Sequence, residues 1–238
     1  MLIGGKNMNN QQKQWDKSYN RRENFLFYPH EEIIRFFSKY IRRRIELDEF
    51  ENIFSFKTPP RILDLGCGIG RHIFYANSFG LDAYGIDLSK AAIRTAWEWA
   101  RREGFLNYRE KIKRGDIRKL PYPNKYFNFA ISHAVLDSMS FKIAKEAVSE
   151  LARVMKKDGL FYCDLISGDD SLHFREFDEE EVVQTSHERG TIQLYFNFAK
   201  IRSLMDSLFD IVECMLIKKE SVISNQSRAR YHLVLRKK

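Results

Sequence analysis

The sequence predicts an α/β fold: a mostly parallel, seven-stranded sheet with helices on both faces and an antiparallel hairpin at its carboxyl end. Three observations point to it. Short apolar stretches alternate with amphipathic, helix-like stretches along most of the chain, which is typical of repeated β–α units. A glycine-rich turn joins the first of these strands to the helix that follows. A turn of only a few residues separates the last two strands, and so short a connection joins antiparallel neighbours.

Strands are expected where apolar residues run without a helical period and turn residues bound the run. The first strand follows a break at Lys57–Pro60, and the last two flank a turn at Ser224–Ser227. Two prolines in LPYPNK mark the turn before the fourth strand. The expected strands cover residues 61–65, 81–87, 111–117, 127–133, 160–166, 210–222 and 229–237.

Helices are expected where apolar residues recur three or four positions apart. In the segment 31–45, isoleucine and phenylalanine recur at intervals of four, beginning with Ile33. Ser89 is a natural N-cap for a helix that stops at Gly104. The expected helices cover residues 31–45, a stretch that ends near Gly80, residues 89–104, residues 141–157 before Asp158–Gly159, and residues 201–209.

One compact domain is expected, since single α/β domains often run past ~200 residues. Within it, residues 1–55 are expected to form an N-terminal lid and a helix. Residues 56–238 are expected to carry the sheet and the ligand site. An acidic insertion over 167–190 follows the fifth strand and is expected to be irregular.

The chain of 238 residues has 40 Lys and Arg against 32 Asp and Glu, a net charge of +8. Such a balance favours anionic partners, or is simply a soluble surface. No apolar run is long enough to span a bilayer, so we expect no membrane insertion and a cytoplasmic location. Cys67, Cys163 and Cys214 lie far apart without the spacing of a zinc site, so a reducing compartment and no bound metal are expected.

The stretch RILDLGCGIGRH places Gly66, Gly68 and Gly70 directly after the first strand. Glycine allows positive φ and lets a ligand lie against bare backbone, and the next helix points its first amides at the same place. Parallel sheets bind ligands at this carboxyl edge. The pattern is not the dinucleotide fingerprint G-x-G-x-x-G, because Arg71 stands where its third glycine belongs.

Acidic residues mark the ends of three consecutive strands. Asp64 precedes the glycines, Asp87 closes the second strand, and Asp116 follows the third. A carboxylate at Asp87 can accept from both hydroxyls of a ribose, and one at Asp116 can accept from an adenine amino group. These acids suit a ligand with hydroxyls, an amine and a positive charge better than a pyrophosphate. They therefore disfavour an NAD-dependent oxidoreductase.

With these residues in place, the chain resembles the class I S-adenosylmethionine-dependent methyltransferases. The matching pieces are ILDLGCGIGRH, YGIDLS, GDIRKLPYPNKYFNFAISH and ELARVMKKDGLF, in the family's order, over roughly residues 55–166. The resemblance implies a Rossmann-like fold, S-adenosyl-L-methionine as cofactor and S-adenosyl-L-homocysteine as product. One departure is Asn128, where many relatives carry Asp, but it stands at a strand start away from the ligand edge.

The resemblance also implies a role for individual positions. Asp87 would hold the ribose hydroxyls, and Leu88 would pack on the adenine. Asp116 and Ile117 would read the adenine edge, while His133 would lie beside the methionine end and the substrate. The residues implied around the methionine part of the cofactor are Asp64, Gly66, Cys67, Gly68 and Gly70.

Further candidates could meet the cofactor carboxylate, each with a structural alternative. Arg71 either meets this carboxylate or only caps and solvates its helix. Tyr19 and Tyr28, together with Trp15, either form an N-terminal lid whose hydroxyl reaches the carboxylate, or simply pack the N-terminal arm.

Methyl transfer from a sulfonium is an in-line displacement that depends mostly on positioning. A base is needed only where the acceptor must lose a proton. His133 is the candidate for that role, with a purely structural histidine as the alternative. Asp137 either orients His133 or caps a helix start. His187 and Glu188 lie in the insertion on the substrate side, and each is either a substrate contact or solvated.

The sequence favours a small-molecule acceptor, methylated on oxygen or nitrogen. The segment SHAVLD after the fourth strand lacks the Asn/Asp-Pro-Pro-Tyr/Phe motif common in enzymes that methylate amino groups of bases or glutamine. No cysteine stands in a motif like that of RNA carbon-5 enzymes, and no RNA-binding module is visible. An RNA methyltransferase and a cofactor-binding, non-catalytic protein stay as alternatives, and the oligomeric state stays open.

Overall fold

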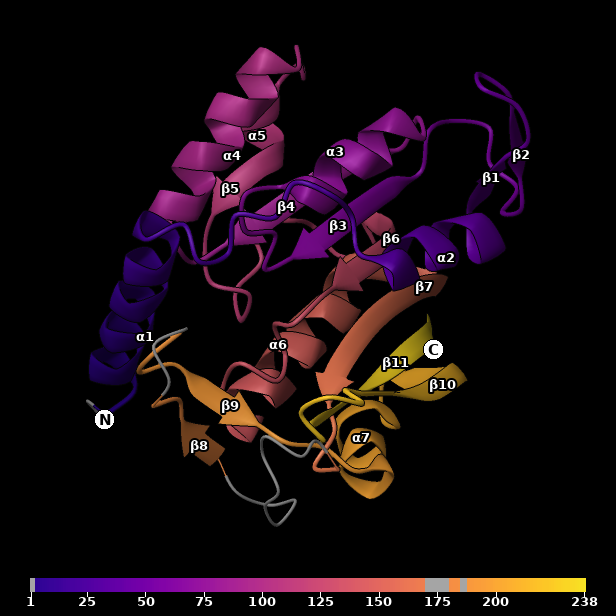
Figure 1. Cartoon of the computed structure of the whole chain (residues 1–238). Coiled ribbons are helices and arrows are strands. Elements are labelled where there is room, and N and C mark those ends of the chain that lie inside the picture. The colour runs from indigo at the N-terminus through magenta and orange to yellow at the C-terminus, as the bar shows by residue number, and fades with distance from the viewer. Residues whose placement is uncertain (1–2, 170–179, 185–187) are drawn as a thin grey trace.

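The computed structural model describes residues 3–169, 180–184 and 188–238 (Figure 1). Its centre is a seven-stranded sheet in the order β10–β11–β7–β6–β3–β4–β5. Neighbours from β7 to β5 are parallel, whereas β11 is antiparallel to both β7 and β10. The predicted fold class is therefore confirmed. The strands are β3 (Arg61–Leu65), β4 (Asp82–Asp87), β5 (Ile112–Arg114), β6 (Phe127–Ser132), β7 (Met155–Ile166), β10 (Phe209–Glu220) and β11 (Ser227–Lys237).

Helices cover both faces of this sheet, and each face has its own apolar core. Side chains of α2, α3 and α4 pack with Ile62 on one face, while those of α6 and α7 pack with Leu63 on the other. Adjacent residues of β3 thus serve opposite cores, as expected for a parallel strand buried on both sides. The helices are α1 (Ile3–Asn20), α2 (Glu31–Tyr40), α3 (Arg71–Ser78), α4 (Lys90–Arg102), α5 (Tyr108–Lys111), α6 (Phe141–Val154) and α7 (Phe198–Met205).

Helix caps fix where several of these elements begin. The predicted N-cap of α4 is confirmed: the Ser89 hydroxyl accepts from the amide of Ala92 at 3.1 Å. Ser140 caps α6 and Asn197 caps α7 in the same way. Among the described residues, no helix is both long enough and apolar enough to cross a bilayer.

The helix predicted over residues 31–45 is too long. It ends at Tyr40, and Arg42–Arg44 form a short strand, β1, that pairs with β2 (Phe50–Asn52). The guanidinium groups of Arg42 and Arg44 lie over the Phe50 ring, 4.5 and 5.0 Å from its centre. These cation–π contacts and the strand pairing outweigh the helical spacing of the isoleucines.

The helix predicted over residues 141–157 also ends early, at Val154. Met155 instead pairs with Phe127 and begins β7, before the expected start of that strand. The predicted turn residues Asp158–Gly159 form an irregularity inside the strand, where the register shifts and Asp158 adopts φ +61°. A turn signal there reflects a bulge rather than a helix end.

Besides the short helix α5, an N-terminal helix and a hairpin were not expected from the sequence. The polar N-terminal stretch forms α1, and part of the expected irregular insertion forms a hairpin of β8 (Glu180–Val182) and β9 (Ile192–Leu194). Residue 167 bridges to Phe196, which brings the end of this hairpin beside the carboxyl end of β7. Both unexpected elements lie near the carboxyl edge of the sheet (Figure 1).

Candidate functional site

The loop between β3 and α3 places its three predicted glycines in left-handed backbone conformations. The amides of Gly66 and Cys67 both donate to the carbonyl of Ile86 on the neighbouring strand, at 2.8 and 3.0 Å. Gly68 has φ +54°, and a side-chain carbon there would lie 2.5 Å from the Tyr19 hydroxyl. The loop therefore presents bare backbone at the carboxyl edge of the sheet.

Asp87 ends β4 directly beside this loop. Its Oδ2 accepts from the amide of Gly68 and its Oδ1 from the amide of Ser89, both at 2.8 Å. The side chain is buried, and burial raises the pKa of Asp87 to about 6 despite these two amide bonds. The structure thus ties the predicted ribose-binding acid to the glycine loop.

Asp64 is the next-to-last residue of β3, just before the same loop, and is 2% exposed. Its Oδ2 is buried and has no hydrogen-bond partner among the residues that the structure describes. Nδ1 of His72 lies 3.6 Å away, beyond hydrogen-bond range, and burial lowers the pKa of His72. A buried carboxylate oxygen without a donor is unfavourable unless a ligand supplies one.

The predicted adenine contacts follow β5 and β4. Asp116 binds the Arg118 side chain, with Nε at 3.0–3.1 Å and NH2 at 2.7 Å. Ile117 is buried in the core under the sheet, and Leu88 is half-buried. The Asp116 carboxylate therefore follows β5, but the Arg118 side chain already donates to both of its oxygens.

The N-terminal helix α1 covers this edge. Asp16 accepts from the Ser89 hydroxyl at 2.6 Å and from the Ala91 amide at 3.1 Å, so it joins α1 to the start of α4. Tyr19 follows with its hydroxyl against Gly68. Burial raises the pKa of Tyr19 well above its usual value, with Asp87 as the next cause, so this phenol stays neutral.

The remaining candidates for the cofactor carboxylate differ in position. Arg71 begins α3, and its NH1 donates to the backbone carbonyl of Tyr28 at 3.3 Å. Tyr28 is 85% exposed. The structure therefore brings Arg71 and Tyr19 to the candidate site but not the Tyr28 ring. Trp15 is half-buried on α1.

His133 follows β6, the strand beside β3. Its Nδ1 lies 2.9 Å from Oδ2 of Asp164, a buried residue of β7. The other Asp164 oxygen accepts from the amide of Ala134 at 2.7 Å, and Arg230 Nε donates to Oδ2 at 2.7 Å. His133 thus lies against a buried carboxylate, although its Nδ1 is outside hydrogen-bond geometry.

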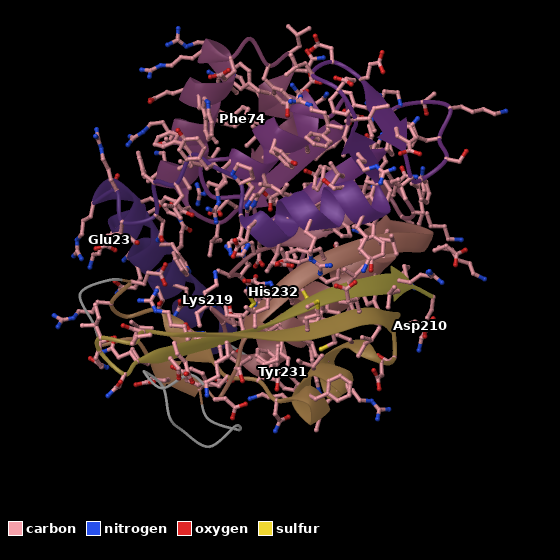
Figure 2. The ribbon with its side chains drawn as sticks, turned by 45° about the vertical axis from the view of Figure 1, so that its right-hand side comes forward. Glu23, Phe74, Asp210, Lys219, Tyr231 and His232 are labelled. Carbon is pink, nitrogen blue, oxygen red and sulfur yellow. The ribbon has the colours of Figure 1, made fainter. Side chains whose placement is uncertain are left out.

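Three more imidazoles gather around His133. The His30 ring lies 4.3 Å from it and the His72 ring 5.6 Å, measured between ring centres. The His232 ring stacks 5.9 Å from His30, and its Nδ1 is 2.8 Å from the Tyr162 hydroxyl. Figure 2 shows His232 and its neighbour Tyr231 on opposite sides of β11. Among the described residues, no set of His, Cys, Asp and Glu side chains is arranged to hold a metal.

Comparison with known proteins agrees with this geometry. The family described as a methyltransferase domain matches residues 63–163, which run from β3 into β7. Residues 63–163 therefore resemble a methyltransferase domain. A crystal structure of S-adenosylmethionine-dependent methyltransferases from Methanosarcina mazei shares its fold, with a TM-score of 0.64 and 21% identity. That likeness covers 76% of this chain and 94% of the other.

Other relatives match a shorter segment of the chain or share a lower sequence identity. The "Uncharacterized methyltransferase YcgJ" of Bacillus subtilis is 30% identical over 101 residues, 42% of this chain and 38% of that protein. The "Probable tocopherol O-methyltransferase, chloroplastic" of Oryza sativa is 35% identical over 99 residues, 41% of this chain and 26% of that protein. The 1,6-didemethyltoxoflavin-N1-methyltransferase of Burkholderia thailandensis shares the fold, with a TM-score of 0.56, 16% identity, and coverage of 76% and 72%. The matched segments span less than half the length of these curated relatives.

Asp137 lies in the matched segment but makes no hydrogen bond or ion pair with His133 among the described residues. It binds Arg230 and accepts from the amide of Ile166 at 2.9 Å, while its carbonyl accepts from the amide of Leu194 at 2.7 Å. Burial raises the pKa of Asp137, although Arg230 opposes that rise. Asp137 thus joins β7, β9 and β11, which is neither of the two roles, orienting His133 or capping a helix start, that the sequence offered.

Sequence reasoning missed several residues around His133. Asp164 carried one signal that would have found it, a charged residue in the apolar strand FYCDLI. His30, Arg230 and His232 carried none, because each is a single polar residue in an unremarkable local pattern. Of the insertion candidates, His187 lies outside the described residues. The amide of Glu188 donates to Glu23 at 3.3 Å.

Proposed function

We propose that the protein is an S-adenosylmethionine-dependent methyltransferase that acts on a small-molecule acceptor, at oxygen or nitrogen. The observation that carries the proposal is the pair of buried carboxylates that flank the glycine loop. Asp87 fixes that loop through the Gly68 amide, and Asp64 Oδ2 lacks a donor. A ligand with hydroxyls and a cation satisfies both acids.

The residues present fit this cofactor. A carboxylate offers about four acceptor positions, so Asp87 keeps positions for ribose hydroxyls after binding two backbone amides. Asp64 would accept from the cofactor ammonium, and Arg71 or Tyr19 would meet its carboxylate. Asp116 would accept from the adenine amino group beside its Arg118 partner. When bound, the cofactor supplies an electrophilic methyl group on a positively charged sulfur.

The chain's own contribution is then to position the reactants and keep water out. Helix α1 lies over the carboxyl edge, and the contacts of Asp16 with Ser89 and Ala91 hold it there. We infer that residues 1–55 act as the cover of the site, and that residues 56–238 supply its floor. Orienting two reactants in this way lowers a barrier by ~7–11 kcal/mol at best.

Two relatives support a small acceptor without deciding its atom. The Burkholderia thailandensis structure holds 1,6-didemethyltoxoflavin and S-adenosylhomocysteine, and that protein is named for an N1-methylation. The Oryza sativa relative is named as a probable O-methyltransferase. A small acceptor at this site and a cytoplasmic location both stay predictions for this chain.

The test is calorimetric titration with S-adenosylhomocysteine and, separately, NAD, at low and high salt. We expect micromolar binding of the first, none of the second, and transfer of a labelled methyl group from S-adenosylmethionine to a small molecule. Transfer to RNA that falls steeply with salt would favour the alternative acceptor, since phosphate contacts release counterions. Absence of S-adenosylhomocysteine binding by the folded protein would refute the proposal.

A further inference from the structure

We propose that the amino edge of the sheet carries a second ligand site, which binds a small molecule with a phosphate group and an apolar body. The site lies at the opposite end of β3 and β4 from the glycine loop, so it is separate from the proposed cofactor site and does not depend on methyl transfer. It is indicated by a cavity, by the cations that line the cavity, and by an apolar segment of its wall.

The cavity lies where three parallel strands begin. Its volume is about 750 Å³, and its wall includes Arg61 at the start of β3, Asp82 at the start of β4 and Asn128 near the start of β6. The loop 54–60, which joins β2 to β3, closes one side of it. Figure 1 shows the β1–β2 hairpin, which leads into this loop, on the far side of β3 from α1. Small-molecule sites usually enclose ~300–1,000 Å³, so this cavity has room for one.

Four cationic side chains line the cavity, against the single carboxylate of Asp82. Nζ of Lys111 lies 2.8 Å from one Asp82 oxygen, and Nε of Arg61 lies 3.4 Å from the other. The carboxylate therefore holds these two cations side by side. The other two are Lys57 and Lys156, and neither forms an ion pair with a residue that the structure describes. The wall thus keeps an excess of positive charge.

Asn128 keeps that charge from being cancelled. Its Oδ1 accepts from the backbone amide of Arg61 at 3.2 Å and from the ammonium of Lys156 at 3.1 Å. An amide oxygen holds the lysine in place without neutralising it, whereas a carboxylate would neutralise it. This is the position at which the chain departs from the family that it resembles, in which many members carry Asp. The substitution therefore makes this edge more favourable for an anion.

Arg61 has the donors that a phosphate requires. Its guanidinium lies 4.2 Å from the centre of the Tyr126 ring, a cation–π contact that fixes its position. Within the part of the chain that the structure describes, the guanidinium makes no hydrogen bond, and its buried Nε has none. A planar guanidinium binds two phosphate oxygens at once, and a lysine ammonium adds a point charge. Arg61 with Lys57 and Lys156 therefore suits a phosphate group.

The same wall has an apolar part. Phe54, Phe56, Pro59 and Leu81 line the cavity beside the cations. The Phe54 ring is held edge-on against the buried Phe129 ring, with 5.0 Å between their centres. Ligand sites usually combine apolar walls with a few polar groups that orient the ligand. An apolar body joined to a phosphate matches this combination.

The surrounding surface favours a small molecule over a nucleic acid chain. The basic cluster next to the cavity belongs to β1, and its charges are already engaged. Arg42 and Arg44 lie over the Phe50 ring, and Arg43 pairs with Glu51. The available cations are therefore gathered in one cavity and do not continue along β1 as the basic stripe that a nucleic acid backbone needs.

The first experiment is calorimetric titration with phenyl phosphate, in the presence of S-adenosylhomocysteine so that the other site is filled. We expect one phenyl phosphate per chain, with a Kd below about 1 mM, and weaker binding at high salt because salt screens the cations. Inorganic phosphate should bind more weakly, since it lacks the apolar body. Absence of saturable phenyl phosphate binding would overturn the site, and equal binding of inorganic phosphate would overturn its apolar part.

The second experiment uses variants that change the charge of the wall. Asn128→Asp preserves the shape of the side chain, and Lys57→Gln changes an exposed loop residue, so at least one folded variant is available. We expect each to weaken phenyl phosphate binding by ~10–100-fold, the value of a charge-assisted hydrogen bond, with unchanged binding of S-adenosylhomocysteine. The matched control is Lys142→Gln, an exposed lysine of α6 outside the cavity, which should bind as the wild type does.

Two results would contradict the proposal. Wild-type affinity for phenyl phosphate in both folded variants, or an equal loss in Lys142→Gln, would show that the anion binds elsewhere or responds only to net charge. Displacement of phenyl phosphate by an RNA oligonucleotide at a far lower concentration than its own Kd would show that the cations serve a nucleic acid and not a small molecule.

Discussion

Asp87 shows how one side chain links the loop, the next helix and the ligand site. Its two oxygens each hold a backbone amide, one from the glycine loop and one from the start of α4. The same carboxylate has further acceptor positions beyond these two bonds. Its burial is unfavourable in the free protein, which is seen in its raised pKa of about 6. Hydrogen bonds from a bound ribose would offset that burial.

We predict that Asp87→Asn weakens S-adenosylhomocysteine binding by ~1.5–3 kcal/mol, the value of charge-assisted hydrogen bonds. Calorimetric titration measures the change. The matched control is Asp82→Asn, which alters the same residue type at the other end of β4, where Asp82 binds Lys111 at 2.8 Å. Equal losses of affinity in the two variants would show that Asp87 stabilises β4 and does not bind the ligand.

The raised pKa of Asp87 also predicts a pH dependence of binding. The carboxyl is ionised above about pH 6 and becomes protonated below it, so an acceptor for the ribose hydroxyls is lost as pH falls. We expect the affinity for S-adenosylhomocysteine to be constant near neutrality and to fall, by up to about tenfold per pH unit, below about pH 6. Titrations of the wild type and Asp87→Asn at several pH values test this. A flat wild-type profile would contradict it, as would an equally steep profile in the variant.

At the scale of elements, α1 is the least expected part of the site. Its sequence is polar, with no apolar face that would have predicted a buried helix. It is held by specific contacts, with Asp16 on the start of α4 and Tyr19 over Gly68. Such a helix can leave the edge without exposing a large apolar core, which suits a cover that opens for ligand exchange.

We predict that Asp16→Ala speeds the release of S-adenosylhomocysteine by about tenfold, because it removes charge-assisted bonds worth ~1.5–3 kcal/mol between α1 and α4. Thermal unfolding should change little, since α1 adds little to either apolar core. Stopped-flow displacement measures the release rate. Lys17→Ala, an exposed position on the same helix, should release the ligand at the wild-type rate. Similar rates in both variants would show that α1 is not a cover.

At the scale of the whole molecule, Arg230 joins the carboxyl-terminal hairpin to the site. From β11 it binds Asp164 of β7 and Asp137 of the loop after β6. Burial lowers the tendency of Arg230 to hold its proton, but the two carboxylates more than offset this, and its pKa is raised. One cation thus stabilises two buried acids that lie in separate parts of the sequence.

We predict that Arg230→Met destabilises the protein by ~3–5 kcal/mol, because it leaves both acids buried without their cation. Urea unfolding, followed by circular dichroism, measures the loss. Arg228→Met removes an exposed arginine from the same strand and should change stability by less than about 0.5 kcal/mol. A loss in Arg230→Met as small as in the control would mean that solvent reaches these acids.

Much of the fold and half of the site could be predicted because the signals are local. Alternating strand and helix patterns, turn residues and caps predicted the succession of strands and helices along the chain. The strand β3 was predicted with its observed bounds. The glycine loop, Asp64 and Asp87 follow directly from strands, and so their shared edge could be inferred. Errors arose where a contact from another segment decided the outcome, as with Phe50 under Arg42 and Arg44.

By itself, then, the sequence determined the sheet, the glycine loop and the acids at its carboxyl edge, because hydrophobic period and turn chemistry act over a few residues. Only the tertiary structure decided which side chains surround His133. His30, His133 and His232 come from a loop, a strand end and an antiparallel strand. They meet with Asp164 because β7 lies between β11 and β6. Strand order depends on packing of the whole chain, so no local pattern foretells which single histidines it will bring together.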